Sequence, residues 1–317
     1  MGQRLPTVVL LMGPTACGKT ELAVRLHAEL PLDVISVDSA MVYRGMDIGT
    51  AKPSAAVLAD CPHRLIDICD PAESYSAGRF VQEARREIEQ ILKAGRTPLL
   101  VGGTMLYFRA LQRGLADLPA ADADVRSVID AEADRRGWSA LHGDLARLDP
   151  AAAARIRPTD PQRIQRALEV FLITGTPLSH LQAAAETAAP PWRFVKLGLW
   201  PEDRQGLRSR IGQRFCQMME TGLEDEVLRL RDRPDLHPDM PSMRAVGYRQ
   251  IWAWLDGGCS REEAIDRSVI ATAQLAKRQL TWMRAEKGLE RLSVPSETLV
   301  DEAIQNLRRQ RVPAGQL

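Results

Sequence analysis

Four short apolar runs stand out along the chain, and each is long enough for one buried strand. They are TVVLLM at 7–12, DVISV at 33–37, TPLLVGG at 97–103 and RFVKLGLW at 193–200. Continuous rather than alternating hydrophobicity is typical of strands that are covered on both faces, as in parallel sheets. We therefore predict core strands at these four positions.

The segments between the first three runs show the period of amphipathic helices. Leu22, Leu26 and Leu30 recur at helical spacing after the first run. The stretch 78–94 carries a similar apolar stripe, and Gly95 supplies a stop signal. Strands that alternate with helices in this way predict an α/β fold, with a parallel sheet flanked by helices.

The pattern changes after residue 118. Residues 119–189 are rich in Ala, Arg and Asp, follow a helical period and contain prolines, with no run that suggests a strand. We interpret this stretch as an all-helical domain inserted into the α/β core. The predicted organisation is a first core part at 1–118, the insertion at 119–189, and a second core part at 190–317 that is mostly helical after Pro201.

Composition narrows the class of protein. The 317 residues are 45% hydrophobic and 26% charged, as in ordinary globular enzymes, and the formal net charge is +1. A nucleic-acid partner would therefore have to meet a local basic face. Five cysteines without a Cys-x-x-Cys pair predict reduced thiols, and the absence of His-x-x-x-His spacing argues against a zinc site. With no membrane-spanning run and no signal peptide, we expect a cytoplasmic protein.

The first apolar run leads into GPTACGKT, which has the spacing of a phosphate-binding loop. In such a loop, backbone N–H groups and a helix N-terminus face the phosphate, a lysine adds a cation and a hydroxyl binds magnesium. The position between a predicted strand and an amphipathic helix is the context that this motif requires. The predicted diphosphate-binding residues are Gly13, Pro14, Thr15, Ala16, Cys17, Gly18, Lys19 and Thr20.

Two more strand ends place polar side chains at the same edge of the sheet. Asp38 follows the run at 33–37, and Thr104 follows the Gly-Gly pair that ends the run at 97–103. Because the carboxyl ends of parallel strands border the ligand crevice, we expect both side chains beside the phosphate loop. Each residue also has a purely structural interpretation, since Asp and Thr are common helix N-caps.

Five motifs extend over most of the sequence. They are GPTACGKT at 13–20, DSAMVYRGMDIGTAKP at 38–53, VGGTMLYFRAL at 101–111, DPQRIQRALEV at 160–170 and MRAVGYRQIW at 243–252. Together, in this order, they resemble the bacterial tRNA dimethylallyltransferases (tRNA isopentenyltransferases). Two positions depart from that family: Cys17 stands where Ser is usual, and Met41 where Gln is usual.

The resemblance implies a phosphate-loop NTPase-like fold and a specific reaction. A dimethylallyl group would pass from dimethylallyl diphosphate to the exocyclic N6 amine of the adenine 3′-adjacent to the anticodon (position 37), in tRNAs that read UNN codons. The loop would then hold a diphosphate that is released, with Mg²⁺ on Thr20. Asp38 would be the general base, and the predicted catalytic set also contains Thr104, Arg214 and Arg210.

Arg210 and Arg214 lie four residues apart, so one helix face would present both. The resemblance assigns an arginine of this segment to the diphosphate, and we favour Arg214. The competing interpretation is a basic stripe that faces solvent.

The resemblance and a cluster of arginines in the insertion predict a surface for the anticodon stem-loop, with the protein acting as a monomer. The predicted tRNA contacts are Asp38, Ser39, Ala40, Met41, Thr104, Arg126, Gln162, Arg163, Ile164, Gln165, Arg166, Met243, Arg244, Ala245, Val246, Gly247, Tyr248, Lys277 and Arg278. A salt-bridged helix exposed to solvent is the competing interpretation of the insertion. Trp282 is predicted to be a core residue.

Three other functions fit parts of the pattern. The loop alone would suit a small-molecule kinase, but no motif for a nucleotide-base pocket or lid accompanies it. A non-catalytic RNA-binding protein that uses the loop as a nucleotide switch would not need Asp38 and Thr104 at one crevice. Transfer to free adenine nucleotides would not need a basic insertion.

Overall fold

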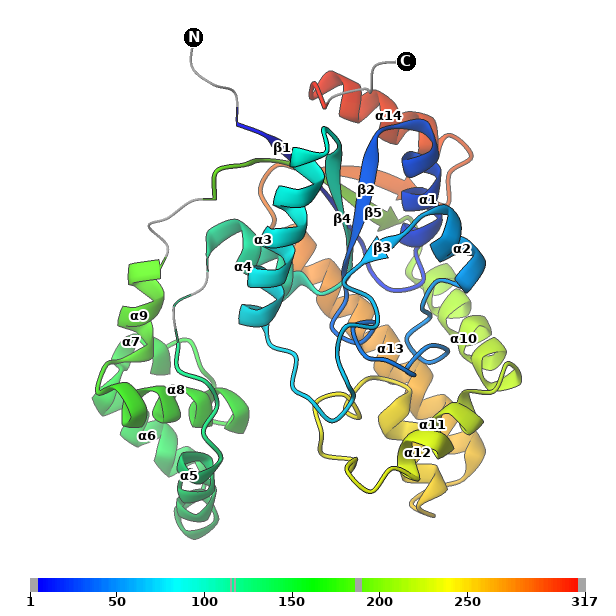
Figure 1. Cartoon of the computed structure of the whole chain (residues 1–317). Helices are drawn as coiled ribbons and strands as arrows, with labels where there is room; N and C mark the ends of the chain where they lie inside the picture. Colours follow the sequence, from blue (N-terminus) through cyan, green and yellow to red (C-terminus); the bar gives the residue numbers. More distant parts are fainter. Residues whose placement is uncertain (1–4, 115, 117, 186–189, 313–317) are drawn as a thin grey trace. The chain divides into compact units, whose positions relative to one another are not determined.

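A computed structural model describes residues 5–114, 116, 118–185 and 190–312. Its strands form one parallel sheet in the order β3-β2-β4-β1-β5-β6 (Figure 1). The strands are β1 Thr7–Met12, β2 Leu32–Val37, β3 His63–Arg64, β4 Thr97–Gly102, β5 Arg193–Pro201 and β6 Leu289–Val294. The predicted parallel α/β fold is confirmed, and the four predicted strands match β1, β2, β4 and β5.

Helices cover both faces of this sheet (Figure 1). The compact unit that contains the sheet also contains α1 Lys19–Glu29, α2 Ala55–Asp60, α3 Ala77–Lys93, α10 Arg204–Glu220, α11 Leu223–Arg231, α12 Tyr248–Leu255, α13 Arg261–Arg284 and α14 Leu299–Arg309. On one face α1 and α14 share a core cluster with Val9 and Leu11 of β1, while α3 packs on β2 and β4 from the other face. Val8 and Leu10 are equally buried, which explains why β1 is apolar without alternation.

The helix predicted at 78–94 is α3, and Gly95 ends it as expected. Gly95 has a φ of +75°, and its N–H donates to the carbonyl of Leu92 at 3.0 Å. Two strands were missed, because β3 has only two residues and β6 is an edge strand in which only Leu292 and Val294 are buried. The chain after Pro201 is mostly helical as predicted, with β6 as a strand that the prediction did not contain.

The chain forms two compact units, Met1–Arg109 with Pro191–Leu317, and Ala110–Pro190. The insertion predicted at 119–189 lies inside the second unit, although its residues 186–189 are outside the described part. That unit contains α5 Ala123–Arg136, α6 Trp138–Leu148, α7 Pro150–Ala153, α8 Pro161–Thr174 and α9 Leu178–Ala185, and α4 Met105–Arg113 precedes them. The part of 119–189 that the structure describes contains no strand, as expected.

The insertion has a hydrophobic core of its own. Ile129 of α5, Leu141 and Leu145 of α6, and Ile164 of α8 are buried together in one cluster. The amphipathic spacing of these residues therefore serves to join the helices of the insertion into a small bundle. Among the described residues, no helix is both long and apolar enough to span a bilayer.

Candidate active site

The phosphate loop between β1 and α1 lines a cavity of about 680 Å³ in the α/β unit. Ala16 has a φ of 59° and Gly18 a φ of 83°, so the loop turns through the left-handed region at two residues. A Cβ atom on Gly13 would lie 2.7 Å from the sulfur of Cys17, which explains the need for glycine there. Lys19 folds back, and its Nζ donates to the carbonyl of Pro14 at 2.7 Å.

A buried glutamine that sequence analysis missed holds this loop in place. The Oε1 atom of Gln279 accepts a hydrogen bond from the Thr15 amide, and its Nε2 atom donates to the Gly103 carbonyl, both at 2.9 Å. Gln279 therefore joins the loop to the Gly-Gly turn after β4. The available signal was a polar residue within the buried stripe of α13, where Ala276, Leu280 and Met283 are its apolar neighbours.

Arg210 and Arg214 lie on one face of α10, as their spacing predicted, and both contact the loop rather than solvent alone. The Nε atom of Arg210 donates to the Ala16 carbonyl at 3.3 Å, and Nη2 of Arg214 donates to the Thr15 hydroxyl at 3.0 Å. Burial lowers the pKa of the Arg214 guanidinium, and the negative charge of Asp38 opposes that shift. Within the described residues Arg214 forms no ion pair at bonding distance, so its charge is available to an anion in the cavity.

Asp38 and Thr104 also line the cavity, from the ends of β2 and β4. The Oδ1 atom of Asp38 accepts from the amides of Ala40 and Met41, at 2.9 and 3.3 Å. The Thr104 hydroxyl accepts from the Ser39 amide at 3.1 Å. No helix begins directly after Asp38, so the helix-capping interpretation is wrong: Oδ1 closes a local turn instead. The same two hydrogen bonds fix the orientation of the carboxylate that lines the cavity.

Residues of the DIGTAKP motif line the cavity. A second buried residue that sequence analysis missed holds this motif in place. The carboxylate of Glu226, on α11, accepts from the amides of Asp47, Ile48 and Gly49 at 2.9 to 3.1 Å. It also accepts from the hydroxyl of Tyr248 at 2.5 Å, and its residue is 2% exposed. The signal was one acidic residue at a position of α11 that faces the core.

The burial of two side chains corrects two predicted tRNA contacts. Tyr248 is fully buried, and a Cβ on Gly49 would lie 2.5 Å from its ring, so the two motifs interlock. The side chain of Met243 is also fully buried. The predicted contact with tRNA is therefore wrong for both side chains, which lie in the interior of the protein.

Other predicted residues are accessible from the cavity. Arg244, Ala245, Val246 and Arg278 line it, together with Ser39, Ala40 and Met41, whereas Gly247 is buried and Lys277 is exposed outside the lining. Trp282 also lines the cavity and is 39% exposed, with the Arg109 guanidinium 5.7 Å from its ring centroid. The prediction that Trp282 belongs to the core is wrong, because its face of α13 is turned to the cavity.

In the insertion, some of the predicted tRNA contacts are buried or paired within the protein, and others are exposed. Arg126 and Arg166 both pair with Glu169, whose carboxylate is fully buried, at 2.8 and 2.7 Å. Ile164 is fully buried in the helical core, so the predicted contact of its side chain with tRNA is wrong. Gln162 and Arg163 are exposed at the start of α8, and Gln165 donates to Asp130 at 2.6 Å.

The chain is similar to known protein families and proteins over most of its length. The family model described as IPP transferase matches residues 41–286, and a model described as isopentenyl transferase matches residues 6–68. The chain belongs to the IPP transferase family. Among its relatives is a protein named tRNA dimethylallyltransferase from Thioalkalivibrio sulfidiphilus, 58% identical over 91% of this chain and 90% of the relative. A protein of the same name from Alkalilimnicola ehrlichii is 57% identical over 92% of each chain.

Solved structures of IPP transferases extend this likeness to the fold. The tRNA isopentenylpyrophosphate transferase of Bacillus halodurans has a TM-score of 0.70 at 39% identity, covering 97% of this chain and 98% of its own. A eukaryotic dimethylallyltransferase described as acting on tRNA has a TM-score of 0.80 at 25% identity, covering 98% and 81%. The phosphate-loop NTPase-like fold predicted from the motifs is therefore confirmed.

The two departures from the family pattern occupy different environments. Cys17 is buried under the loop, and burial raises the pKa of its thiol, so it adds no negative charge beside a phosphate. Met41 lines the cavity and replaces a polar side chain with a thioether at the predicted contact with the target base.

Proposed function

We propose that this protein transfers a dimethylallyl group from dimethylallyl diphosphate to N6 of adenine 37 in tRNAs that read UNN codons, with release of diphosphate. The observation that carries the proposal is the convergence of the phosphate loop, Asp38 and Arg214 on one cavity. The names of relatives that match this chain at 57% and 58% identity support the same reaction.

The adenine amine requires activation because its lone pair is delocalised into the ring. In the proposed reaction N6 attacks C1 of the dimethylallyl group, a C–N bond forms, and the C1–O bond breaks with its electron pair passing to diphosphate. The N6 proton passes to the carboxylate of Asp38, whose orientation is fixed by the amides of Ala40 and Met41. General-base assistance of this kind contributes about 10²–10⁴-fold to rates.

The leaving diphosphate gains negative charge, and the other side of the cavity is suited to stabilise it. The loop amides, Lys19 and Arg214 supply positive charge in a partly buried site, where electrostatic stabilisation is effective. Arg210, held on the Ala16 carbonyl, lies beside them. Thr104 would position the substrates through its hydroxyl.

The cavity also suits Mg²⁺. Thr20 offers a hydroxyl oxygen, the type of ligand that this ion prefers. Among the described residues no group of three or more His, Cys, Asp or Glu could hold a metal, so diphosphate and water would supply most of the ligands. When bound, Mg²⁺ would neutralise part of the diphosphate charge.

Recognition of tRNA would use exposed groups on each unit. Arg244 and Arg278 border the cavity in one unit, and Gln162 and Arg163 are exposed at the start of α8 in the other. Enzymes that modify a base within a structured nucleic acid extrude that base first, which requires contacts to the flanking nucleotides. Arginine and amide side chains are suited to such single-stranded loops.

The proposal is tested with labelled dimethylallyl diphosphate, Mg²⁺ and unmodified tRNA, followed by nucleoside analysis. We expect N6-dimethylallyladenosine at position 37, no product with a tRNA that carries G37, and weaker use of the donor by Lys19→Ala. Product formation that consumes ATP would instead support a kinase-like use of the loop. Binding of tRNA without turnover would support an RNA-binding protein, and labelling of free AMP would support a nucleotide prenyltransferase.

A further inference from the structure

The loop between β3 and α3 joins two segments that border the cavity. Residues 67–69 run beside the segment 38–44, here called the Asp38 segment. The Asp67 amide donates to the Met41 carbonyl at 3.2 Å, and the amides of Ile68 and Cys69 both donate to the Val42 carbonyl at 2.9 Å. These hydrogen bonds from the loop therefore fix the backbone position of Met41.

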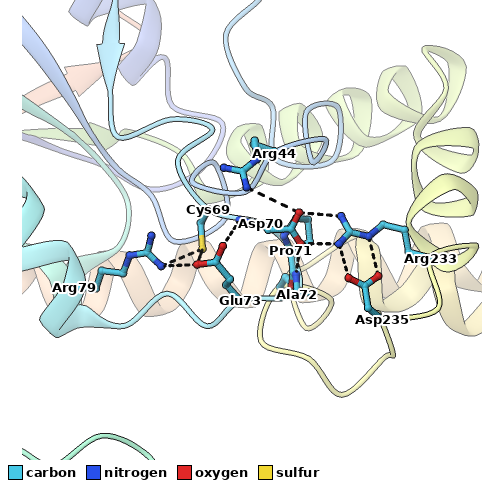
Figure 2. Close-up of polar contacts among 10 residues, drawn as sticks. Arg44, Cys69, Asp70, Pro71, Ala72, Glu73, Arg79, Arg233 and Asp235 are labelled. Carbon is cyan, nitrogen blue, oxygen red and sulfur yellow. Dashed lines mark hydrogen bonds and ion pairs between the residues drawn. The ribbon is translucent and has the colours of Figure 1, made fainter.

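The next residues of the same loop contact a different part of the chain (Figure 2). Arg233 donates to both oxygens of Asp70, at 3.1 and 2.7 Å, in a bidentate pair. The hydroxyl of Ser242, which is fully buried, donates to the Pro71 carbonyl at 2.6 Å. Arg233 and Ser242 belong to residues 232–247, here called the Arg244 segment, which connects α11 to α12 without a helix or strand.

Both partners of the bidentate pair are held in one orientation. Asp70 also accepts from the Ala72 amide at 2.9 Å, and its own amide donates to Glu73 at 3.3 Å. Glu73 in turn pairs with Arg79 at 3.0 Å (Figure 2). Arg233 forms a second pair of hydrogen bonds with Asp235, at 3.1 and 2.7 Å. Arg233 holds the pKa of the Asp70 carboxyl below its ordinary value, so this carboxylate is charged at neutral pH.

We infer that Asp70 and Arg233 are positioning residues for tRNA, which set Arg244 relative to Met41, two residues that both line the cavity. The inference rests on the proposed function. Its physical basis is that the Arg244 segment has no helix or strand, and among the described residues its backbone–backbone hydrogen bonds are local, such as that from the Arg244 amide to the Met240 carbonyl at 3.0 Å. Tertiary contacts such as Arg233–Asp70 must therefore fix where its exposed arginine lies.

A purely stabilising role predicts a different result. Arg233 and Asp70 are each about one-third exposed, and ion pairs of that kind contribute little to global stability. The pair does, however, restrict a segment that presents a cation to the cavity. Loss of the pair should therefore affect tRNA binding much more than unfolding.

The direction in which tRNA binding changes distinguishes a positioning role from a simple charge effect. Asp70→Ala removes a negative charge near a surface that would bind RNA, so a charge effect alone would strengthen tRNA binding. Positioning predicts the opposite: Asp70→Ala and Arg233→Ala should each raise KM for tRNA about tenfold, with kcat changed less than twofold. The double variant should be no worse than either single variant, because both remove the same pair.

Steady-state kinetics and donor affinity, measured on the full chain, test this inference. Arg229→Ala is the matched control, since Arg229 is an exposed arginine of α11 outside the pair. Hydrogen exchange at residues 243–246 should quicken in Asp70→Ala, while the melting temperature and the donor Kd stay near wild type. Tighter or unchanged tRNA binding by Asp70→Ala, or additive effects in the double variant, would overturn the inference. Absence of prenyl transfer by the wild type would instead refute the proposed function.

Discussion

At the scale of single residues, the site depends on side chains whose orientation is fixed by hydrogen bonds to neighbouring backbone groups. Asp38 is the clearest case, because one carboxylate both organises its own loop and faces the cavity. We predict that Asp38→Asn lowers kcat by about 10²-fold or more. Its amide oxygen can still accept from the Ala40 amide, so tRNA affinity and the melting temperature should change little. Single-turnover prenyl transfer beside filter binding of tRNA checks both expectations, and near-normal turnover would remove Asp38 from the mechanism.

The residues of the site differ in how far sequence could reveal them. Asp38 and Thr104 follow a recognisable rule, since strand ends place them at the ligand edge of the sheet without any knowledge of packing. For Arg214, helical spacing gave only a face shared with Arg210, and its place at the diphosphate loop came from the family resemblance. Gln279 and Glu226 follow no such rule, because their partners are backbone amides more than 170 residues away in the chain. Tyr248 and Trp282 were misjudged for the same reason. An aromatic residue on an amphipathic helix faces either the core or a cavity according to which element packs against it.

At the scale of elements, Glu226 holds the loop 47–49 against α11. It accepts from three amides and from Tyr248, and a glutamine there would turn an NH₂ group toward one of these donors. We predict that Glu226→Gln lowers the free energy of unfolding by about 2–3 kcal/mol. Because Gly49 and Thr50 line the cavity, kcat/KM should fall as well.

Urea unfolding and steady-state kinetics measure these effects of Glu226→Gln. Asp225→Asn, at the preceding and exposed position of α11, is the control and should leave both quantities unchanged. Tyr248→Phe removes only one donor and should cost about 1 kcal/mol. Equal stability of Glu226→Gln and Asp225→Asn would contradict the anchoring role.

The insertion contains a comparable anchor with a pH dependence. Burial raises the pKa of Glu169, but hydrogen bonds from Arg126, Arg166 and the Asp122 amide outweigh it, so the net pKa is lowered. A lowered pKa in the folded state means that the carboxylate stabilises the insertion above its unfolded pKa, near 4.3. This contribution is lost as pH falls through the folded pKa.

Glu169→Gln should therefore destabilise the insertion at pH 7, and the difference from wild type should shrink as the pH falls below about 4. Hydrogen exchange of α8 amides in wild type and variant, compared at each pH, measures that difference. Asp134→Asn is a suitable control, because Asp134 is an exposed acidic residue of α5. A difference that grows on acidification would show that the sign is wrong.

At the scale of the whole molecule, the sequence predicted the architecture better than the edge strands and the boundary of the inserted unit. The buried strands were visible because a parallel sheet covered on both faces needs continuous apolar runs. β3 and β6 were not, because edge strands need fewer apolar side chains. The change of composition after residue 118 marked the insertion, but the second compact unit begins at Ala110, where α4 continues with the same amphipathic pattern.

The two units give the proposed enzyme separable tasks, which leads to a last prediction. Arg157 and Arg163 are exposed in the insertion, and neither pairs with the buried Glu169 that holds its helices together. If they bind phosphates and extruded bases, Arg157→Ala/Arg163→Ala should raise KM for tRNA and flatten the salt dependence of binding.

The donor Kd of this double variant should remain at the wild-type value, since the cavity residues all belong to the other unit. Arg135→Ala/Arg147→Ala, which removes two exposed arginines paired within their own helices, is the matched control for lost charge. Filter binding of tRNA across a salt series, beside donor titrations, distinguishes the cases. Equal salt slopes for the two double variants would mean that the insertion meets tRNA through a surface other than the start of α8.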